Sequence, residues 1–251
     1  MKKILMGFSA IALVLATPLL ALTADCSAND DMYSYNIVYP SNYQPSHNDK
    51  IVYLTFDDGP TKYTLDILNI LAEHDVPATF FVVGNREHTH LMADIIEHGH
   101  VIGLHSYNHD FKQIYSSSES FFTDLQKIDD IVYNEIGLRS MILRFPGGSS
   151  VTRGATKTLM KQLSSEVQEK GYQYFDWNCD SGDKRGSATA SEALSKIKSS
   201  AKTAGDIVIV LMHDTESITV QYLPDVIKYF KEQGYTFLPL TPNSPAIHHS
   251  W

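Results

Sequence analysis

Short apolar runs and longer amphipathic runs alternate along most of this chain, and that alternation limits the folds it can adopt. The apolar runs are rich in β-branched and aromatic residues and are bounded by polar turns, which is typical of strands. The amphipathic runs place apolar residues three or four positions apart, which is typical of helices with one buried face. A strand, a helix and a second strand in succession predict βαβ units and therefore a parallel sheet.

We predict strands at 51–56, 78–83, 101–104, 141–145, 172–177, 207–212 and 235–240. We predict helices at 63–74, 91–98, 118–136, 156–170, 188–203 and 218–233. The run at 207–212 contains no polar residue, as expected of a strand that is buried on both faces. About seven parallel strands with helices between them predict an α/β fold, a distorted (β/α) barrel.

The N-terminus predicts a signal peptide at 1–24. Lys2 and Lys3 form a basic start, residues 4–22 carry no charge, and Leu-Thr-Ala at 22–24 resembles a small-residue cleavage site. An uncleaved membrane anchor is the alternative, because the apolar run is of marginal length for a span. With cleavage we expect no stable membrane span and a secreted or extracytoplasmic protein, which can associate with the cell wall.

The remaining organisation is one domain with two flanking segments. Residues 25–48 are polar and predict a linker, 49–243 the domain, and 244–251 a C-terminal tail. No internal repeat stands out, and we expect a monomer. Cys26 lies in the linker and Cys179 in the domain, and their separation leaves open whether they form a disulfide.

The formal net charge of −9 indicates which partners to expect. An acidic chain argues against nucleic acid bound through phosphate contacts. It does not exclude an anionic glycan, because a groove can differ in charge from the whole surface.

Two polar clusters follow the first and third predicted strands. Asp57 and Asp58 are adjacent carboxylates in a turn, so that one can bind a metal while the other acts as a base. His105 and His109 lie four residues apart, which allows both imidazoles to reach one ion. Each cluster alone is a weak signal, since Asp-Gly turns and surface histidines are common.

Three more clusters follow later strands. Arg144 begins an Arg-Phe-Pro-Gly-Gly turn and can hold a carboxylate by two parallel hydrogen bonds. The segment 176–183 contains three acids and Trp177, and its alternative interpretation is a solvated loop. His213 ends the buried strand, where a general acid or a structural histidine is expected.

Taken together, the five clusters resemble those of the NodB-homology polysaccharide deacetylases, carbohydrate esterase family 4. Their order along the chain is Thr-Phe-Asp-Asp-Gly, His-Ser-x-x-His, Arg-x-Pro-x-Gly, an acidic segment with Trp, and Leu-x-His. The resemblance runs from Ile51 to about Leu240, and it implies the same barrel fold. It implies that Asp57 is the catalytic base. It also implies a divalent metal, Zn²⁺ first with Co²⁺ or Ni²⁺ as alternatives, bound by the metal ligands Asp58, His105 and His109.

The resemblance assigns the other site residues as well. Arg144 would orient the base, the Gly147 N–H would help to bind the oxyanion, and Leu211 would line the acetyl pocket. His213 would be the general acid, with a nearby carboxylate as its partner. Asp183 has the motif position for that carboxylate, and Asp180 is the alternative.

The chain departs from the family pattern in two places. Gly147 stands where many members have a bulky aromatic, which predicts a more open groove on that side. Lys184 follows Asp183 where many members have Trp. Trp177 is then the candidate for substrate contact on that wall.

The function implied is metal-dependent hydrolysis of acetyl groups from a polysaccharide, N-acetylglucosamine of peptidoglycan being the first expectation. Chitooligosaccharide and acetylxylan are the alternative substrates. A non-catalytic glycan-binding module of the same fold is the runner-up. A peptidase or a phosphatase is a third possibility. The sequence does not support it, because it contains neither a His-Glu-x-x-His helix nor a phosphate-binding glycine loop.

Overall fold

The structure, a computed structural model, describes residues 49–250 of the chain. Its strands are β1 (Ile51–Asp57), β2 (Thr79–Val83), β3 (Val101–Ser106), β4 (Ile142–Leu143), β5 (Gln173–Tyr174), β6 (Cys179–Asp180), β7 (Ile207–His213) and β8 (Thr236–Phe237). Its helices are α1 (Thr64–Glu73), α2 (Leu91–Glu97), α3 (Phe111–Ile114), α4 (Ser118–Ile136), α5 (Lys157–Glu169), α6 (Ala190–Ala204) and α7 (Ser217–Glu232).

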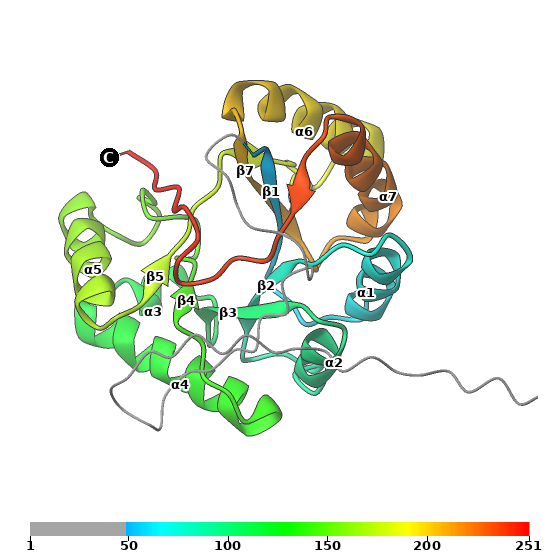
Figure 1. Ribbon diagram of the computed structural model, residues 1–251. Helices are drawn as coiled ribbons and strands as arrows, with labels where there is room; N and C mark the ends of the chain where they lie inside the picture. Colours follow the sequence, from blue (N-terminus) through cyan, green and yellow to red (C-terminus); the bar gives the residue numbers. More distant parts are fainter. Residues whose placement is uncertain (1–48, 251) are drawn as a thin grey trace, which may run out of the picture. The chain divides into compact units, whose positions relative to one another are not determined.

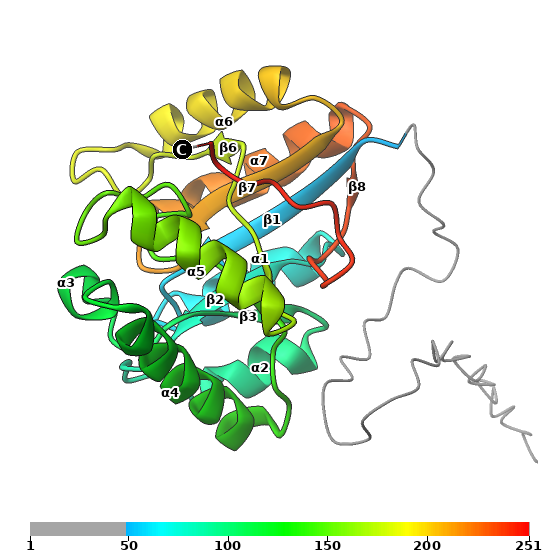
Figure 2. The ribbon, with the colours of Figure 1, turned by 90° about the vertical axis from the view of Figure 1, so that its left-hand side faces the viewer.

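The strands form one parallel sheet in the order β5-β4-β3-β2-β1-β7-β6, with β8 beside the start of β1 (Figure 1). Helices lie along the outer face of the sheet, as both views show (Figures 1 and 2). In the described part of the chain β5 and β6 do not pair, so the curled sheet does not close. The predicted distorted (β/α) barrel of about seven parallel strands is confirmed.

Two elements were not predicted from the sequence. The helix α3 has only four residues, and the strand β6 only two. Both are too short to show a period. The strand β6 pairs with β7 inside the acidic segment, so this segment is part of the sheet and not only a solvated loop.

Alternation along the strands separates two apolar clusters. The larger one fills the space between the sheet and the helices and includes Leu54 and Phe56. The smaller one lies on the inner face of the sheet and includes Ile51, Tyr53 and Ile209. Because successive strand residues point to opposite faces, every second residue beyond this inner cluster also points inward.

That periodicity places the polar residues at the strand ends. Thr55 and Asp57 continue the inner face of β1, and Leu211 and His213 continue that of β7. Their register pairs Thr55 with Leu211 and Asp57 with His213. His105 continues the inner face of β3 in the same way. The C-terminal ends of three strands therefore bring these side chains to one side of the sheet.

Three further expectations from the sequence concern the two cysteines, the N-terminal segments and a membrane span. Cys179 is fully buried, its thiol donates to the Ile197 carbonyl oxygen at 3.5 Å, and burial raises its pKa to about 12. Cys26, the predicted signal peptide and the predicted linker lie outside the described residues. Among the residues described, no helix is both long enough and apolar enough to span a membrane.

The buried imidazole of His100 makes stability depend on pH. His100 is 5% exposed, and its Nδ1 accepts a hydrogen bond from the Ala78 N–H at 3.2 Å. Burial, with a smaller effect of His98, lowers the pKa of His100 from 6.5 to about 4. Between these values the unfolded chain binds a proton that the folded chain does not. Acid therefore favours unfolding across this window, and the stability is regained as the pH rises to 6.5.

We expect His100→Asn, which keeps an acceptor for the Ala78 N–H, to flatten this dependence. Between pH 6.5 and 4 the parent should lose up to about 3 kcal/mol more unfolding free energy than the variant. Urea unfolding at both pH values measures the difference. The exposed His90→Asn is the control, and equal losses in the His100 variant and the parent would contradict the assignment.

Candidate active site

One carboxylate and two imidazoles converge at the ends of β1 and β3. Asp58 Oδ1 lies 3.4 Å from His105 Nε2 and 3.2 Å from His109 Nε2. Their potential ligand atoms lie within 4.8 Å of one another. Asp58 and His109 both have positive φ, which is uncommon outside glycine and concentrates at functional sites. The sequence predicted these three residues as a metal site, and the fold brings them together.

The protonation of these groups suits a bound cation. His105 Nδ1 donates to the Arg144 carbonyl oxygen at 2.7 Å, which leaves the Nε2 lone pair facing Asp58. Burial lowers the pKa of His105 and brings that of His109 to about 3, so both rings are neutral at pH 7. Asp58 Oδ1 is buried and has no hydrogen-bond partner among the described residues. A cation would satisfy that oxygen, so this donor set fits a divalent metal.

Asp57 lies beside this group and is held by a fully buried arginine. Arg144 Nη1 donates to Asp57 Oδ1 at 2.8 Å and to Thr55 Oγ1 at 2.7 Å. The other two guanidinium nitrogens of Arg144 donate to backbone carbonyl oxygens, Nε to that of Phe175 at 2.9 Å and Nη2 to that of Asp176 at 3.2 Å. Arg144 therefore gives Asp57 one hydrogen bond rather than the two parallel bonds that the sequence suggested, because Nε and Nη2 donate to backbone carbonyl oxygens and Nη1 is shared with Thr55. The second carboxylate oxygen of Asp57 makes no hydrogen bond to Arg144.

His213 lies across from Asp57 and is fixed by Asp183. Its Nδ1 donates to Asp183 Oδ1 at 2.7 Å, and its backbone N–H donates to Oδ2 at 2.8 Å. Burial opposes ionisation of Asp183, but the hydrogen bonds from His213 and Tyr222 outweigh it and lower the pKa of this carboxyl. Asp180, the alternative partner, forms an ion pair with Lys196 instead.

These groups share one pocket of about 340 Å³. The described residues that line it are Asp57, Asp58, His105, His109, Phe111, Gly147, Arg153, Trp177, Lys184, Leu211 and His213. Arg144 and Asp183, also predicted site residues, do not line it; they hold the base and the histidine from behind.

Gly147 occupies a turn that only glycine fits. Its φ is +80°, and a Cβ there would lie 2.8 Å from Val151 Cγ2 and 2.9 Å from the Phe111 ring. These two side chains take the space beside Gly147, so the open wall predicted at this position is partly filled by neighbours. Among the described residues the Gly147 N–H donates to no protein acceptor. It is therefore available to an oxyanion.

Trp177 is held in the pocket wall by the C-terminal segment. His249 Nε2 donates to the Trp177 carbonyl oxygen at 2.9 Å, and the two rings meet edge to face at 4.6 Å. The buried Asp176 carboxylate accepts from the His249 N–H and from the N–H and hydroxyl of Ser149. Asp176 thus joins the Gly147 turn, Trp177 and the C-terminal segment, a role that sequence reasoning missed.

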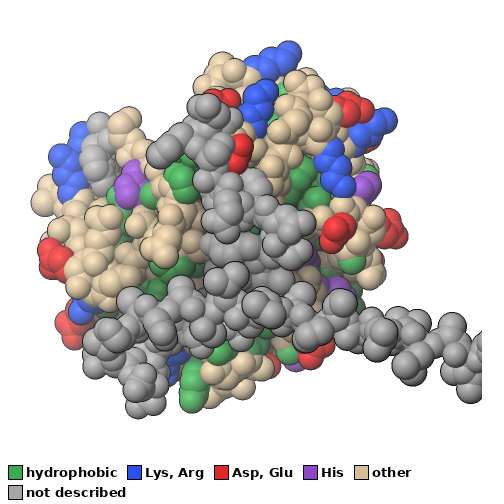
Figure 3. All heavy atoms as spheres, in the orientation of Figure 1, with side chains coloured by type: hydrophobic (Ala, Val, Ile, Leu, Met, Phe, Trp, Pro, Cys, Tyr) green, Lys and Arg blue, Asp and Glu red, His purple; other side chains and the backbone are tan. Residues whose placement is uncertain are grey.

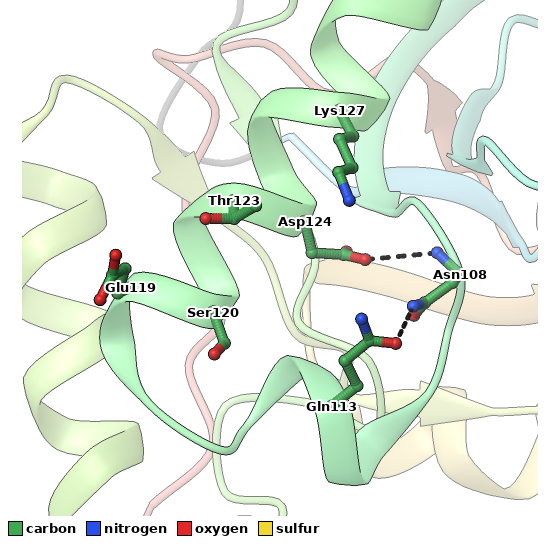
Figure 4. A pocket seen from close by; sticks show the side chains of 7 residues that line it. All are labelled: Asn108, Gln113, Glu119, Ser120, Thr123, Asp124 and Lys127. Atoms are coloured by element: carbon green, nitrogen blue, oxygen red, sulfur yellow. Dashed lines mark hydrogen bonds between the residues drawn. The ribbon is translucent and has the colours of Figure 1, made fainter.

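Asp124, on α4, was also missed, and it fixes the end of β3 and the loop that leads from His105 to His109. Its Oδ2 accepts from Ser106 Oγ at 2.7 Å and from the Tyr107 N–H at 2.8 Å, while Oδ1 accepts from the Asn108 N–H at 3.3 Å. Ser106 Oγ in turn accepts from the His109 N–H at 2.9 Å. Figure 4 shows Asp124 pointing from α4 towards Asn108, beside a second pocket of about 200 Å³. The positive φ of His109 is therefore supported by a carboxylate 15 residues farther along the chain.

Two further side chains line the pocket, and the sequence analysis gave neither of them a role. Lys184 pairs through its ammonium with Asp58. Arg153, between β4 and α5, lies over the Phe111 ring, with its guanidinium carbon 4.9 Å from the ring centre. Their place in the chain, on loops whose conformation depends on packing, gave no signal for either contact.

Comparison with known proteins places the chain among characterised relatives. A polysaccharide deacetylase family model matches residues 44–173. A peptidoglycan-N-acetylglucosamine deacetylase of Bacillus cereus is 33% identical over 209 residues, 80% of this chain and 73% of that protein. A bifunctional xylanase/deacetylase of Pseudobutyrivibrio xylanivorans is 30% identical over 78% of this chain and 31% of that protein.

A solved structure has the same architecture. The catalytic domain of the peptidoglycan N-acetylglucosamine deacetylase from Eubacterium rectale superposes with a TM-score of 0.77. It is 36% identical in sequence, and the match covers 84% of this chain and 99% of that one.

Proposed function

This chain belongs to the polysaccharide deacetylase family of hydrolases, and we propose that it removes acetyl groups from N-acetylglucosamine residues of peptidoglycan. The observation that carries the proposal is one pocket in which Asp58, His105 and His109 converge beside Asp57 and His213. The same set argues against a non-catalytic glycan-binding module, which would need neither the base nor the acid.

The metal site is proposed to hold a divalent cation, Zn²⁺ first, with Co²⁺ or Ni²⁺ as alternatives. Asp58, His105 and His109 would hold it, because one carboxylate and two imidazoles leave positions open for other ligands. When bound, such a cation polarises a carbonyl group and makes water more acidic.

The protein residues would perform the proton transfers. Asp57, oriented by Arg144, accepts a proton from the water that attacks the acetyl carbon. The Gly147 N–H donates to the oxygen of the tetrahedral intermediate, and removing one such donor typically costs about 3 kcal/mol. Leu211 contacts the acetyl methyl group. His213, with Nδ1 held by Asp183, presents Nε2 and protonates the amine as the carbon–nitrogen bond breaks.

The substrate proposal rests on relatives that act on peptidoglycan, on the predicted signal peptide and on Trp177 as a sugar-contact surface. We propose a secreted or extracytoplasmic monomer whose partner is the glycan rather than nucleic acid. Acetylxylan stays a second candidate, because a relative is named a xylanase/deacetylase.

We expect acetate release to require a divalent metal. Protein stripped with a chelator should release no acetate from peptidoglycan, chitooligosaccharide or acetylxylan, and added Zn²⁺ or Co²⁺ should restore release. Metal content measured in the same samples shows whether recovery follows occupancy. Peptidoglycan should be the best substrate of the three. Full activity of the stripped protein would overturn the proposal that a metal is required. A preference for acetylxylan would overturn the proposal that peptidoglycan is the substrate.

A further inference from the structure

The pocket carries two cations that the proposed chemistry does not use. Arg153 enters it from the loop between β4 and α5, and Lys184 from the loop between β6 and α6. Among the described lining residues the only acids are Asp57 and Asp58, which have roles in that chemistry. The remaining charge of the pocket wall is therefore positive, although the chain as a whole has a formal net charge of −9.

Arg153 is placed close to the reacting groups and has no counterion among residues 49–250. Its guanidinium lies over Phe111, and the Phe111 ring meets the His109 ring edge to face with 5.2 Å between centres. One aromatic ring thus separates Arg153 from a proposed metal ligand. Within residues 49–250 Arg153 forms no ion pair, and its side chain is exposed. A guanidinium that is stacked but unpaired remains free to bind an anion.

Lys184 adds a second positive charge from a different loop. Its ammonium pairs with Asp58, while 43% of its side chain is exposed. The side chain is therefore anchored in the pocket and still reachable from solvent. It lies after β6 whereas Arg153 lies after β4, so the two cations come from opposite sides of the opening between β5 and β6.

The charge of the pocket wall differs from that of the face shown in Figure 3, where charged side chains of both signs are interspersed over the outer helices. A surface of mixed charge with net negative charge does not attract an anionic polymer, so local cations have to provide that attraction. A neutral glycan has no group that needs an unpaired guanidinium, whereas a carboxylate can form two parallel charge-assisted hydrogen bonds with it.

We propose that Arg153, assisted by Lys184, binds a carboxylate on a sugar next to the acetylated one. The preferred substrate is then a carboxylate-bearing glycan, and a neutral one is used less well. This inference rests on the proposed deacetylase function and narrows its substrate class. Peptide-free peptidoglycan strands fit it, because every second sugar then carries a free lactyl carboxylate, whereas a stem peptide would convert that group into an amide; chitooligosaccharide carries no carboxylate.

Three substrates test the proposal on metal-loaded, full-length protein. They are peptide-free peptidoglycan strands, the same strands with their carboxylates converted to neutral amides, and chitotetraose. The amidated strands keep every sugar and acetyl group and lose only the charge. We expect kcat/KM for acetate release to be about tenfold higher on the charged strands than on the amidated ones. In about 1 M NaCl, where the screening length is about 3 Å, this preference should largely disappear.

Variants assign the preference to the residues. Arg153→Gln should remove most of the difference between charged and amidated strands through KM, and Arg153→Lys should restore part of it. Lys184→Met should reduce it further, with metal content measured separately because Lys184 contacts Asp58. Arg185→Gln is the control, since Arg185 is exposed on the same loop and does not line the pocket.

The outcomes separate this inference from the proposed function. Equal kcat/KM on charged and amidated strands, or a preference that survives in Arg153→Gln, would overturn the carboxylate site and leave the deacetylase function standing. No acetate from any of the three substrates would overturn both.

Discussion

Asp57→Asn should reduce acetate release by about 10² to 10⁴-fold while the protein retains its metal. Asn has nearly the size of Asp, and its carbonyl oxygen can still accept the hydrogen bond that Arg144 Nη1 gives at 2.8 Å. It cannot accept a proton from water. The loss should therefore fall on kcat, with the fold and the ligands Asp58, His105 and His109 intact.

The neighbouring carboxylate supplies the matched control. Asp58→Asn should lose both activity and metal, because Asp58 Oδ1 faces both imidazoles at 3.2 to 3.4 Å. Acetate release at saturating Zn²⁺ and metal content after dialysis separate the two variants. If Asp57→Asn loses metal and Asp58→Asn keeps it, the roles of the two aspartates are reversed. Circular dichroism excludes unfolding, which matters because Arg144 would remain buried without its carboxylate partner.

The fold was predictable because its central strands, β1 and β7, have seven residues each. Their almost entirely apolar sequences indicate strands that are buried on both faces. Each predicted strand and helix has a counterpart in the structure. Each polar cluster follows a predicted strand, and the C-terminal ends of parallel strands lie on one side of a sheet, so Asp57 and His213 were expected in one site, where their register now pairs them. The helix α3 and the strand β6 were missed because four and two residues carry no periodic signal.

The groups that position the site were harder to predict. Asp124, Asp176 and His249 are ordinary polar residues in sequence, and their roles come from contacts across loops and helices. His249 lies 72 residues from the backbone oxygen that it contacts. Arg153 and Lys184 reach the pocket only through the loop conformations after β4 and β6. Sequence patterns report local periodicity and motif spacing, whereas these contacts depend on how distant segments pack.

His213→Ala should reduce turnover by about 10² to 10⁴-fold and leave metal content near that of the parent. His213 lines the pocket, but the ligand group contains Asp58, His105 and His109 and not this residue. The expected loss arises because His213, held by Asp183, is the proposed proton donor to the departing amine. A variant that loses metal together with activity would instead place His213 in the metal site.

Asp183→Asn should reduce kcat for acetate release by about 10² to 10⁴-fold, the range expected when general-acid catalysis is lost, and leave metal content near that of the parent. The Asp183 carboxylate accepts a hydrogen bond from His213 Nδ1 at 2.7 Å, which directs Nε2 towards the pocket. Asn keeps the size of Asp and an acceptor for the Nδ1–H, but it lacks the negative charge beside the proposed acid. Asp180→Asn, whose carboxylate pairs with Lys196, is the matched control. A loss of turnover in Asp180→Asn but not in Asp183→Asn would remove Asp183 as the group that positions the acid.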